Sequence, residues 1–365
     1  FPTQMTVNYA KNATERHAEI LRVLGRGGVH SEAVLSIQST SEQTLKTIRR
    51  QNIKTERYDE LAGIFRSEDL TFASDLMIGL PGETVESFKA SLQHFFDRDV
   101  YVQAYQTILL PNSPMADPEY IRANKIELVG NVLVGSYSYN IEDLSMMVRT
   151  ARYYALMVNL SIMKYLLYHL QNDRGLRAVD VLARMVQKFE YGDGHTRYPL
   201  ISWLLNRYRS DRSNLAVDLL VPVLDAPSSW DEFFLEVRDF VVEEFGVAGD
   251  AALETALAVQ AAVMPREGEQ YPLSVELKHD FVRYLEDHRA VPAGTPRPPL
   301  SSYPPGRLVV TDPAELSKSE RPEPAERDHV TRFELQSGLP SWTVRFPAAA
   351  RPAGAPAAAS APAAG

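Results

Sequence analysis

The sequence predicts an α/β fold in which about four parallel strands form part of a barrel, followed by a mostly helical domain and a Pro/Ala-rich tail. From Met5 to Leu110, short β-rich runs alternate with longer amphipathic runs, as in repeated β-α units. Helical periodicity then dominates to about residue 290. We therefore expect three parts: residues 1–125 in the barrel, 126–290 in the helical domain and 291–365 in an extended, largely disordered tail.

The first part contains four runs with the composition of strands, separated by helices with recognisable caps. Strands are expected at residues 5–9, 33–38, 71–78 and 102–109. Three caps precede apolar stripes: Asn12 with Glu15 before Ile20, Val23 and Leu24; Ser41 before Leu45 and Ile48; Thr84 before Phe88, Leu92 and Phe95. Four strands cannot close a barrel, so both edges would stay open. Since Phe1 opens into a strand-like run without an initiator Met, we expect a longer protein to supply the missing strands.

After Leu110 the pattern changes. Pro111, Pro114 and Pro118 mark an exit loop, and residues 126–139 are β-prone, which fits either a short hairpin or an extended connector. Helices are expected near 143–172, 176–190, 198–209, 229–245, 250–264 and 274–288. Beyond residue 290 the chain holds 14 of its 24 prolines, a composition typical of disorder. Two strand-like segments in this region, Arg307–Thr311 and Thr331–Leu335, are expected to pack against the rest of the protein.

Composition excludes several functions. Formal net charge is -9, without a long basic cluster, so nucleic acid is not expected as a partner. The apolar stretch Tyr153–Leu170 is interrupted by Asn159, Lys164 and His169, which favours a core helix over a membrane span. The chain has no cysteine, which excludes disulfides and any thiolate-bound zinc or iron-sulfur centre within it, and its eight histidines lack metal-ligand spacing. We expect a cytoplasmic protein that binds no membrane and holds no metal in this chain.

Three polar segments follow the expected strands at their carboxyl ends, where parallel α/β folds bind ligands. They are Ser36-Ile37-Gln38-Ser39, with Arg50 twelve residues after Gln38; Asp75 to Thr84, which reads Asp-Leu-Met-Ile-Gly-Leu-Pro-Gly-Glu-Thr; and Leu109 to Pro114. Each alone is explained by an ordinary turn, and the glycines lack the spacing of dinucleotide or P-loop sites. Their order and spacing together are more specific.

The segment from Met5 to about Tyr120 resembles the second half of the (β/α)6 barrel of radical S-adenosylmethionine enzymes, in the branch with a preceding cobalamin domain. Asn8 to Asn12 match its third strand, Ser36 to Ser39 the fourth, Asp75 to Thr84 the fifth, and Leu109 to Tyr120 the segment after the sixth. The resemblance implies that S-adenosylmethionine is bound as follows: Gln38, Ser39 and Arg50 at its polar groups, Asp75 at the ribose hydroxyls, Gly79, Leu80 and Pro81 near the adenine, Leu110 flanking that base, and Asn8 and Lys11 at the border of the site.

The chain differs from this family in one respect: it contains no cysteine and therefore lacks the cluster-binding Cys-x-x-x-Cys-x-x-Cys loop. The resemblance therefore implies a [4Fe-4S] cluster whose ligands lie outside this chain, and cobalamin if an upstream domain carries it. The intact enzyme is expected to cleave S-adenosylmethionine reductively, to act on a small-molecule substrate, and to take electrons from a flavodoxin or ferredoxin. The chain alone is expected to be an inactive C-terminal portion, with no catalytic residue assigned.

Two alternatives remain open at this stage. A degenerate, non-catalytic barrel with a protein-binding helical domain would lack the cysteine loop upstream, and a phosphate-binding barrel would need a Gly-rich loop at its last strands, where none is visible. The helical domain gives little information about substrate. Tyr153, Tyr154, Tyr165 and Tyr168 recur at helical spacing, which fits core better than a pocket, and Asp193, His195 and Arg197 fit a solvated turn.

Overall fold

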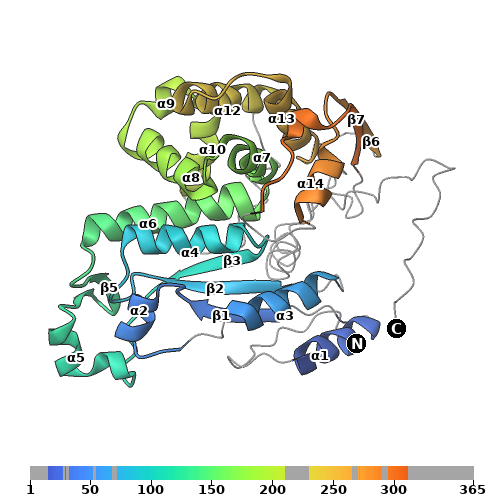
Figure 1. Cartoon of the computed structure of the whole chain (residues 1–365). Coiled ribbons are helices and arrows are strands. Elements are labelled where there is room, and N and C mark those ends of the chain that lie inside the picture. The colour runs from blue at the N-terminus through green and yellow to red at the C-terminus, as the bar shows by residue number, and fades with distance from the viewer. Residues whose placement is uncertain are drawn as a thin grey trace, which may run out of the picture.

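The computed structural model describes residues 15–27, 29, 33–51, 55–67, 72–209, 230–264, 270, 272–289 and 295–310. A parallel sheet of three strands, β1 (Ala33–Gln38), β2 (Phe72–Ile78) and β3 (Tyr101–Gln106), forms one side of the molecule, and a body of helices lies beyond β3 (Figure 1). The expected strands at 33–38 and 71–78 are confirmed almost to the residue. The first expected strand, 5–9, lies outside the described residues.

The last expected strand, 102–109, ends earlier than the pattern indicates. At Thr107 the chain leaves the sheet, and its backbone N–H and hydroxyl both donate to the Ile78 carbonyl, at 3.0 and 2.8 Å. Ile108 then forms a bridge to Val132 of a hairpin made by β4 (Glu127–Val129) and β5 (Val132–Gly135), which confirms the expected hairpin. The apolar run is thus divided between two sheets.

Four helices belong to the sheet region: α1 (Glu15–Arg26), α2 (Glu42–Thr47), α3 (Thr55–Ser67) and α4 (Val85–Phe96). Ser41 and Thr84 cap α2 and α4 as expected, since each hydroxyl accepts a backbone N–H of the first turn, whereas Asn12 lies outside the described residues. The expected stripe of α1 is wrong: Ile20 and Val23 are exposed, and α1 instead buries Ala18 and Leu21. Helix α3, which the pattern analysis missed, buries Tyr58, Leu61 and Ala62.

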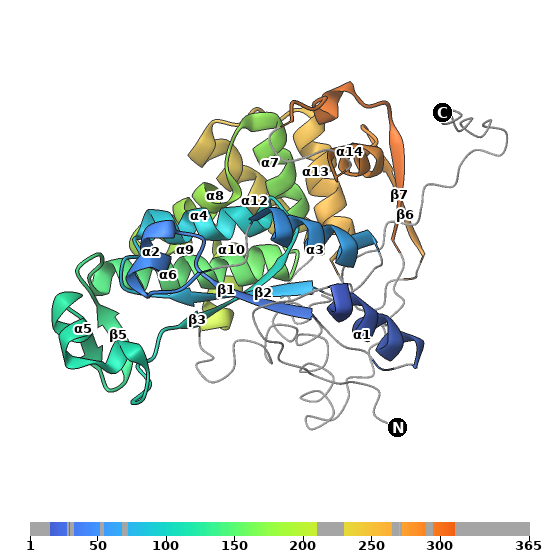
Figure 2. The ribbon, with the colours of Figure 1, turned by 60° about the horizontal axis from the view of Figure 1, so that its bottom comes forward.

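The two faces of the sheet differ sharply. One face carries Leu35, Ile37, Leu76, Ile78 and Val102, all buried, and α3 and α4 lie on one side of the strands (Figure 2). The other face carries Ser36, Asp75, Met77 and Gln103, which keep part of their surface exposed. Successive strand residues point to opposite faces, so the sheet has one apolar, covered face and one polar face.

The outer edge of β3 is covered, contrary to the expectation of two open edges. Asn159 donates from Nδ2 to the Val102 carbonyl at 2.7 Å, and its Oδ1 accepts the Val102 N–H at 3.5 Å. Lys164 also pairs with Asp99, just before β3, at 2.5 Å. An amide side chain thereby pairs with the outward-facing backbone of Val102, as a neighbouring strand would at that position.

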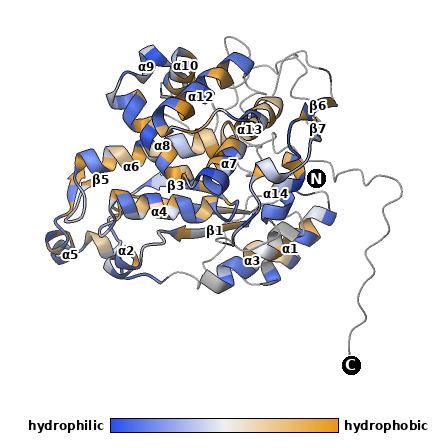
Figure 3. Ribbon diagram, turned by 45° about the horizontal axis from the view of Figure 1, so that its top comes forward, coloured by the Kyte–Doolittle hydropathy of each residue, from blue (hydrophilic) through white to orange (hydrophobic). Residues whose placement is uncertain are grey.

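The helical body contains α6 (Ile141–Tyr154), α7 (Lys164–Arg174), α8 (Ala178–Val186), α9 (Gly194–Arg197), α10 (Pro199–Arg209), α12 (Trp230–Phe245), α13 (Ala251–Ala262) and α14 (Phe281–Arg289). The expected helix 143–172 is interrupted by the π turn η2 (Ala155–Asn159), and the expected helix 176–190 ends in a second π turn, η3 (Gln187–Tyr191). In Figure 3 the helices mix hydrophilic and hydrophobic residues along their length, as amphipathic helices do.

The expected helix 274–288 is wrong in its first half. Residues Leu273–Leu277 form β6, which pairs in antiparallel fashion with β7 (Gly306–Val310), and α14 begins after it. The expected strand Arg307–Thr311 is thus confirmed within β7, while Thr331–Leu335 lies outside the described residues. The alternation Leu-Ser-Val-Glu-Leu has a two-residue period, which the helical interpretation overlooked.

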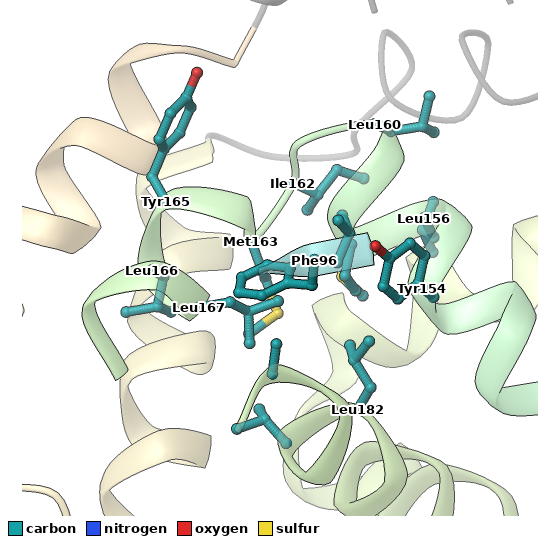
Figure 4. Close-up of a cluster of buried hydrophobic side chains, with 14 of the residues drawn as sticks. Phe96, Tyr154, Leu156, Leu160, Ile162, Met163, Tyr165, Leu166, Leu167 and Leu182 are labelled. Carbon is teal, nitrogen blue, oxygen red and sulfur yellow. The ribbon is translucent and has the colours of Figure 1, made fainter. Parts of the chain in front are cut away.

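One hydrophobic core runs from the covered face of the sheet into the helical body. Figure 4 shows Phe96 of α4 among side chains from η2, α7 and α8, including Leu156, Met163, Leu167 and Leu182. Tyr153, Tyr154 and Tyr165 are buried and Tyr168 stacks near Phe96, so the tyrosine series is core, as expected. No helix within the described ranges is long and apolar enough to cross a membrane.

Candidate functional site

The carboxyl ends of β1 and β2 bring together two of the three predicted polar segments. In the parallel register Ser36 lies opposite Asp75, and Gln38 lies opposite Leu76 after a one-residue irregularity. Gln38 has a φ of 70°, an uncommon conformation for a residue other than glycine. Strained backbone of this kind is concentrated at ligand sites, where it fixes the direction of a side chain.

Asp75 lies on the partly exposed face of the sheet. The Ser36 hydroxyl donates to Asp75 Oδ2 at 2.8 Å, and Gln103 of β3 lies beside Asp75 in the parallel register. Burial raises the pKa of Asp75, and the hydrogen bond from Ser36 lowers it in part. A polar row of three side chains, one from each strand, therefore crosses this face, with a carboxylate at its centre that can accept hydrogen bonds.

The turn after β2 approaches its neighbours closely. Gly79 has a φ of +79°, and a Cβ there would lie 2.8 Å from Leu144 Cδ1 and 3.2 Å from the Tyr139 hydroxyl. Tyr139 donates that hydroxyl to the Gly79 carbonyl at 2.5 Å, and Ser138 Oγ accepts the Gly82 N–H at 2.9 Å. Leu80 and Pro81 are buried beneath the turn. A side chain at position 79 has no room, which explains the glycine.

Glu83, inside the second motif, is a buried acid that sequence reasoning did not select as a site residue. It is 0% exposed and accepts the Ser39 hydroxyl at 3.1 Å. Burial raises the pKa of Glu83 to about 8, against the opposing effects of Ser39 and of the Gly79 and Leu80 backbone. Ser39, the hydrogen-bond partner of Glu83, is also fully buried. The only sequence signal was a carboxylate between a glycine and a helix cap, which is ordinarily an exposed position.

Two predicted residues, Arg50 and Leu110, are not gathered at these strand ends, and two more are not described. Arg50 is exposed in the turn after α2, and Leu110 keeps 57% of its surface exposed in the loop after β3. Asn8 and Lys11 lie outside the described residues. The structure thus unites Gln38, Ser39, Asp75 and Gly79-Leu80-Pro81, and it leaves the guanidinium of Arg50 without a described contact to them.

A small satellite of the fold flanks this end of the sheet. It comprises η1 (Pro114–Ala116), α5 (Pro118–Ala123) and the β4-β5 hairpin, which pack around Tyr120, Ile126 and Leu133. Its Tyr120 hydroxyl donates to the Thr47 carbonyl at 3.1 Å, and the Tyr137 hydroxyl lies 3.1 Å from Thr47 Oγ1. The satellite is thereby fixed against α2, next to the end of β1, and it carries the loop that contains Leu110.

Metal ligands do not cluster in this part of the protein. Within the residues that the structure describes, no group of three or more His, Cys, Asp or Glu side chains is arranged to hold a metal ion. Asp193, His195 and Arg197 are exposed as expected, but His195 and Arg197 lie in the short helix α9 rather than in a turn, and Arg197 pairs with Glu243 of α12.

Comparisons with known proteins find several curated relatives. No family model matches the chain. The chain is 25% identical over 339 aligned residues to the cobalamin-dependent radical SAM methyltransferase TokK of Streptomyces tokunonensis, an alignment that covers 78% of this chain and 49% of TokK. It is 31% identical over 122 residues to the 2-(S-pantetheinyl)-carbapenam-3-carboxylate methyltransferase of Streptantibioticus cattleyicolor, which covers 33% of this chain and 18% of that protein.

A third relative is the tRNA-2-methylthio-N(6)-dimethylallyladenosine synthase of Acinetobacter baumannii, 30% identical over 107 residues, or 27% of this chain and 22% of that protein. The chain spans about half the length of TokK and a smaller share of the other two. All three relatives are enzymes, and the TokK alignment extends well beyond the strand-end motifs into the helical body. The chain is therefore similar to a radical S-adenosylmethionine methyltransferase over most of its length, in line with the resemblance that its strand-end motifs carry.

Proposed function

We propose that this chain binds S-adenosylmethionine at the carboxyl ends of β1 and β2, as part of a longer radical enzyme that transfers a methyl group with the help of cobalamin. The observation that carries the proposal is the juxtaposition, at adjacent strand ends, of the strained Gln38, the carboxylate of Asp75 and the tight Gly79-Leu80 turn. The similarity to TokK supports the cobalamin-dependent methyl transfer.

The residues present suit this cosubstrate. Asp75 is a hydrogen-bond acceptor on the polar face of the sheet, and a carboxylate can accept from both vicinal hydroxyls of a ribose. At Gly79 the absence of a Cβ and the positive φ let Leu144 and Tyr139 pack closely against the turn, which fixes its backbone beside the end of β2. We assign Gln38, Ser39, Asp75, Gly79, Leu80 and Pro81 to this site, and Arg50, Leu110, Asn8 and Lys11 to its border.

The chain does not suit the iron-sulfur cluster of this family, because it has no cysteine. We propose that the cluster ligands, and any cobalamin domain, belong to another part of the protein, and that this chain alone is inactive. An electron donor of the flavodoxin or ferredoxin type, a small-molecule substrate and a cytoplasmic location complete the proposal. The division at residues 125 and 290 into barrel, helical domain and tail remains part of it.

Equilibrium binding of S-adenosylmethionine tests the proposal. Binding would be measured by calorimetry on the 365-residue chain and on the complete gene product, for the unchanged sequence, Asp75→Asn and Asp59→Asn. Asp59 is the matched control, since it is an aspartate of α3 that pairs with Arg98. We expect Asp75→Asn to weaken binding at least about tenfold, the loss expected for one charge-assisted hydrogen bond, and Asp59→Asn to leave it unchanged. Equal affinities for all three proteins, or no binding by the complete protein, would overturn the proposal.

A further inference from the structure

The buried Glu83 connects three segments that meet at the proposed site. Its carboxyl accepts the Ser39 hydroxyl at the end of β1, and Ser39 Oγ in turn accepts the Ser41 N–H at 3.2 Å, at the N-cap of α2. The Glu83 backbone N–H donates to the Leu80 carbonyl at 3.0 Å, which closes the turn after β2. One residue is therefore bonded to both strand ends that the cosubstrate would touch.

The third segment approaches from the start of the helical body. Tyr139 donates its hydroxyl to the Gly79 carbonyl, and burial raises the pKa of this phenol, with a smaller contribution from the nearby Glu83. Among the described residues, Tyr139 is the titratable group that faces Glu83, and no described lysine or arginine pairs with the carboxyl. A buried acid without a cation is costly in its ionised form, so the site favours the neutral one.

We propose that Glu83 is the positioning residue of this site: its buried carboxyl holds the Gln38-Ser39 end of β1 at a fixed distance from the Gly79-Leu80 turn. The role in cosubstrate binding rests on the function proposed above, whereas the link between the strand ends does not. Glu83 is 0% exposed, so it acts through Ser39 and the turn and does not itself touch the ligand.

The link has a pH dependence with a definite sign. When the turn opens, Glu83 meets water and returns toward its ordinary pKa of 4.5, whereas in the closed turn its pKa is about 8. Opening therefore releases a proton between these two pH values, and raising the pH favours the open turn over that interval. Above about pH 8 both forms are ionised and the dependence disappears. A residue with only a packing role would show no such interval.

Hydrogen exchange of the turn, measured by mass spectrometry on the 365-residue chain, tests the link without any ligand. After correction for intrinsic rates, we expect opening of the peptide around residues 79–84 to rise by up to about tenfold per pH unit between pH 5.5 and 7.5 in the unchanged chain. Glu83→Gln keeps the hydrogen bond from Ser39 but cannot ionise, so its opening should not vary with pH. Identical pH profiles for the two proteins would overturn the proposal.

Cosubstrate affinity of the complete protein forms the second test. We expect Glu83→Ala and Ser39→Ala to weaken S-adenosylmethionine binding at least about tenfold, and Glu83→Gln to restore it to within about threefold, since only the glutamine keeps the link. Glu190→Gln is the matched control: Glu190 is also buried, but it pairs with Arg149 and Tyr153 in the helical body. Equal losses in the glutamine and alanine variants of Glu83 would refute the positioning role. If the unchanged protein bound no cosubstrate, the proposed function would fall, and the exchange data alone would decide the link.

Discussion

Replacement of Gly79 by alanine tests the geometry of the turn that ends β2. Two costs are expected. The first is the left-handed backbone at a φ of +79°, which for an L-residue costs about 1–2 kcal/mol. The second is the new Cβ, which would lie 2.8 Å from Leu144 Cδ1 in a packed region, and overpacking of this kind costs about 1–3 kcal/mol. We therefore expect Gly79→Ala to lower the free energy of unfolding by about 2–5 kcal/mol.

Gly63→Ala is the matched control. Gly63 lies inside α3, no heavy atom lies within 4 Å of the position its Cβ would take, and its backbone is helical. The same chemical change should here raise the free energy of unfolding by about 0.5–1 kcal/mol, because alanine is the better helix former. Urea unfolding followed by fluorescence and circular dichroism would measure both variants against the unchanged chain. Effects of the same sign at the two positions would refute the reasoning about the turn.

Two further predictions concern the parts that support the site. Asn159→Ala should lower the free energy of unfolding by about 2–4 kcal/mol, because it leaves the buried Val102 N–H and carbonyl unpaired. Its control is Asn206→Ala, a change at an exposed residue, which should alter the free energy of unfolding by less than about 0.5 kcal/mol. Urea unfolding measures both variants, and equal effects would contradict the role of Asn159 at the strand edge. Asp173 accepts hydrogen bonds from the Tyr284 hydroxyl and the Leu300 N–H and lies 3.1 Å from His169; burial raises its pKa, but these partners outweigh burial and keep it below the usual 3.8. The ionised Asp173 should stabilise the fold fully above about pH 4 and progressively less at lower pH. Asp173→Asn should therefore destabilise the chain at pH 7 and have little effect in acid. A destabilisation that is constant from pH 7 to pH 3 would show that the charge is not involved.

The motifs of this chain could be found in the sequence because they obey local rules. The caps at Ser41 and Thr84 are set within a few residues, and the strands at 33–38 and 71–78 have compositions that suit burial, so both were predicted correctly. Errors arose where a distant segment decides the outcome. Ile20 and Val23 form a good apolar stripe, but α1 turns Ala18 and Leu21 toward the core instead.

The site shows the same division. The order and spacing of Gln38, Asp75 and Gly79 were sufficient to suggest the resemblance that the similarity to TokK supports, because ligand contacts at strand ends constrain residue type position by position. The cosubstrate site itself stays a prediction. The contact of Asn159 with the edge of β3 could not be predicted, because Asn159 and Val102 are 57 positions apart in the chain.

Glu83 is the clearest case of a property that only the tertiary structure decided. In the sequence it is one carboxylate in a turn, a residue type that is ordinarily exposed. In the fold it is fully buried and bonded to Ser39, 44 positions away, and burial rather than any neighbouring charge raises its pKa to about 8. The sequence by itself determined which residues stand at the strand ends. The surrounding packing determined how far they lie from water, and the ionisation of a carboxyl group depends on that distance.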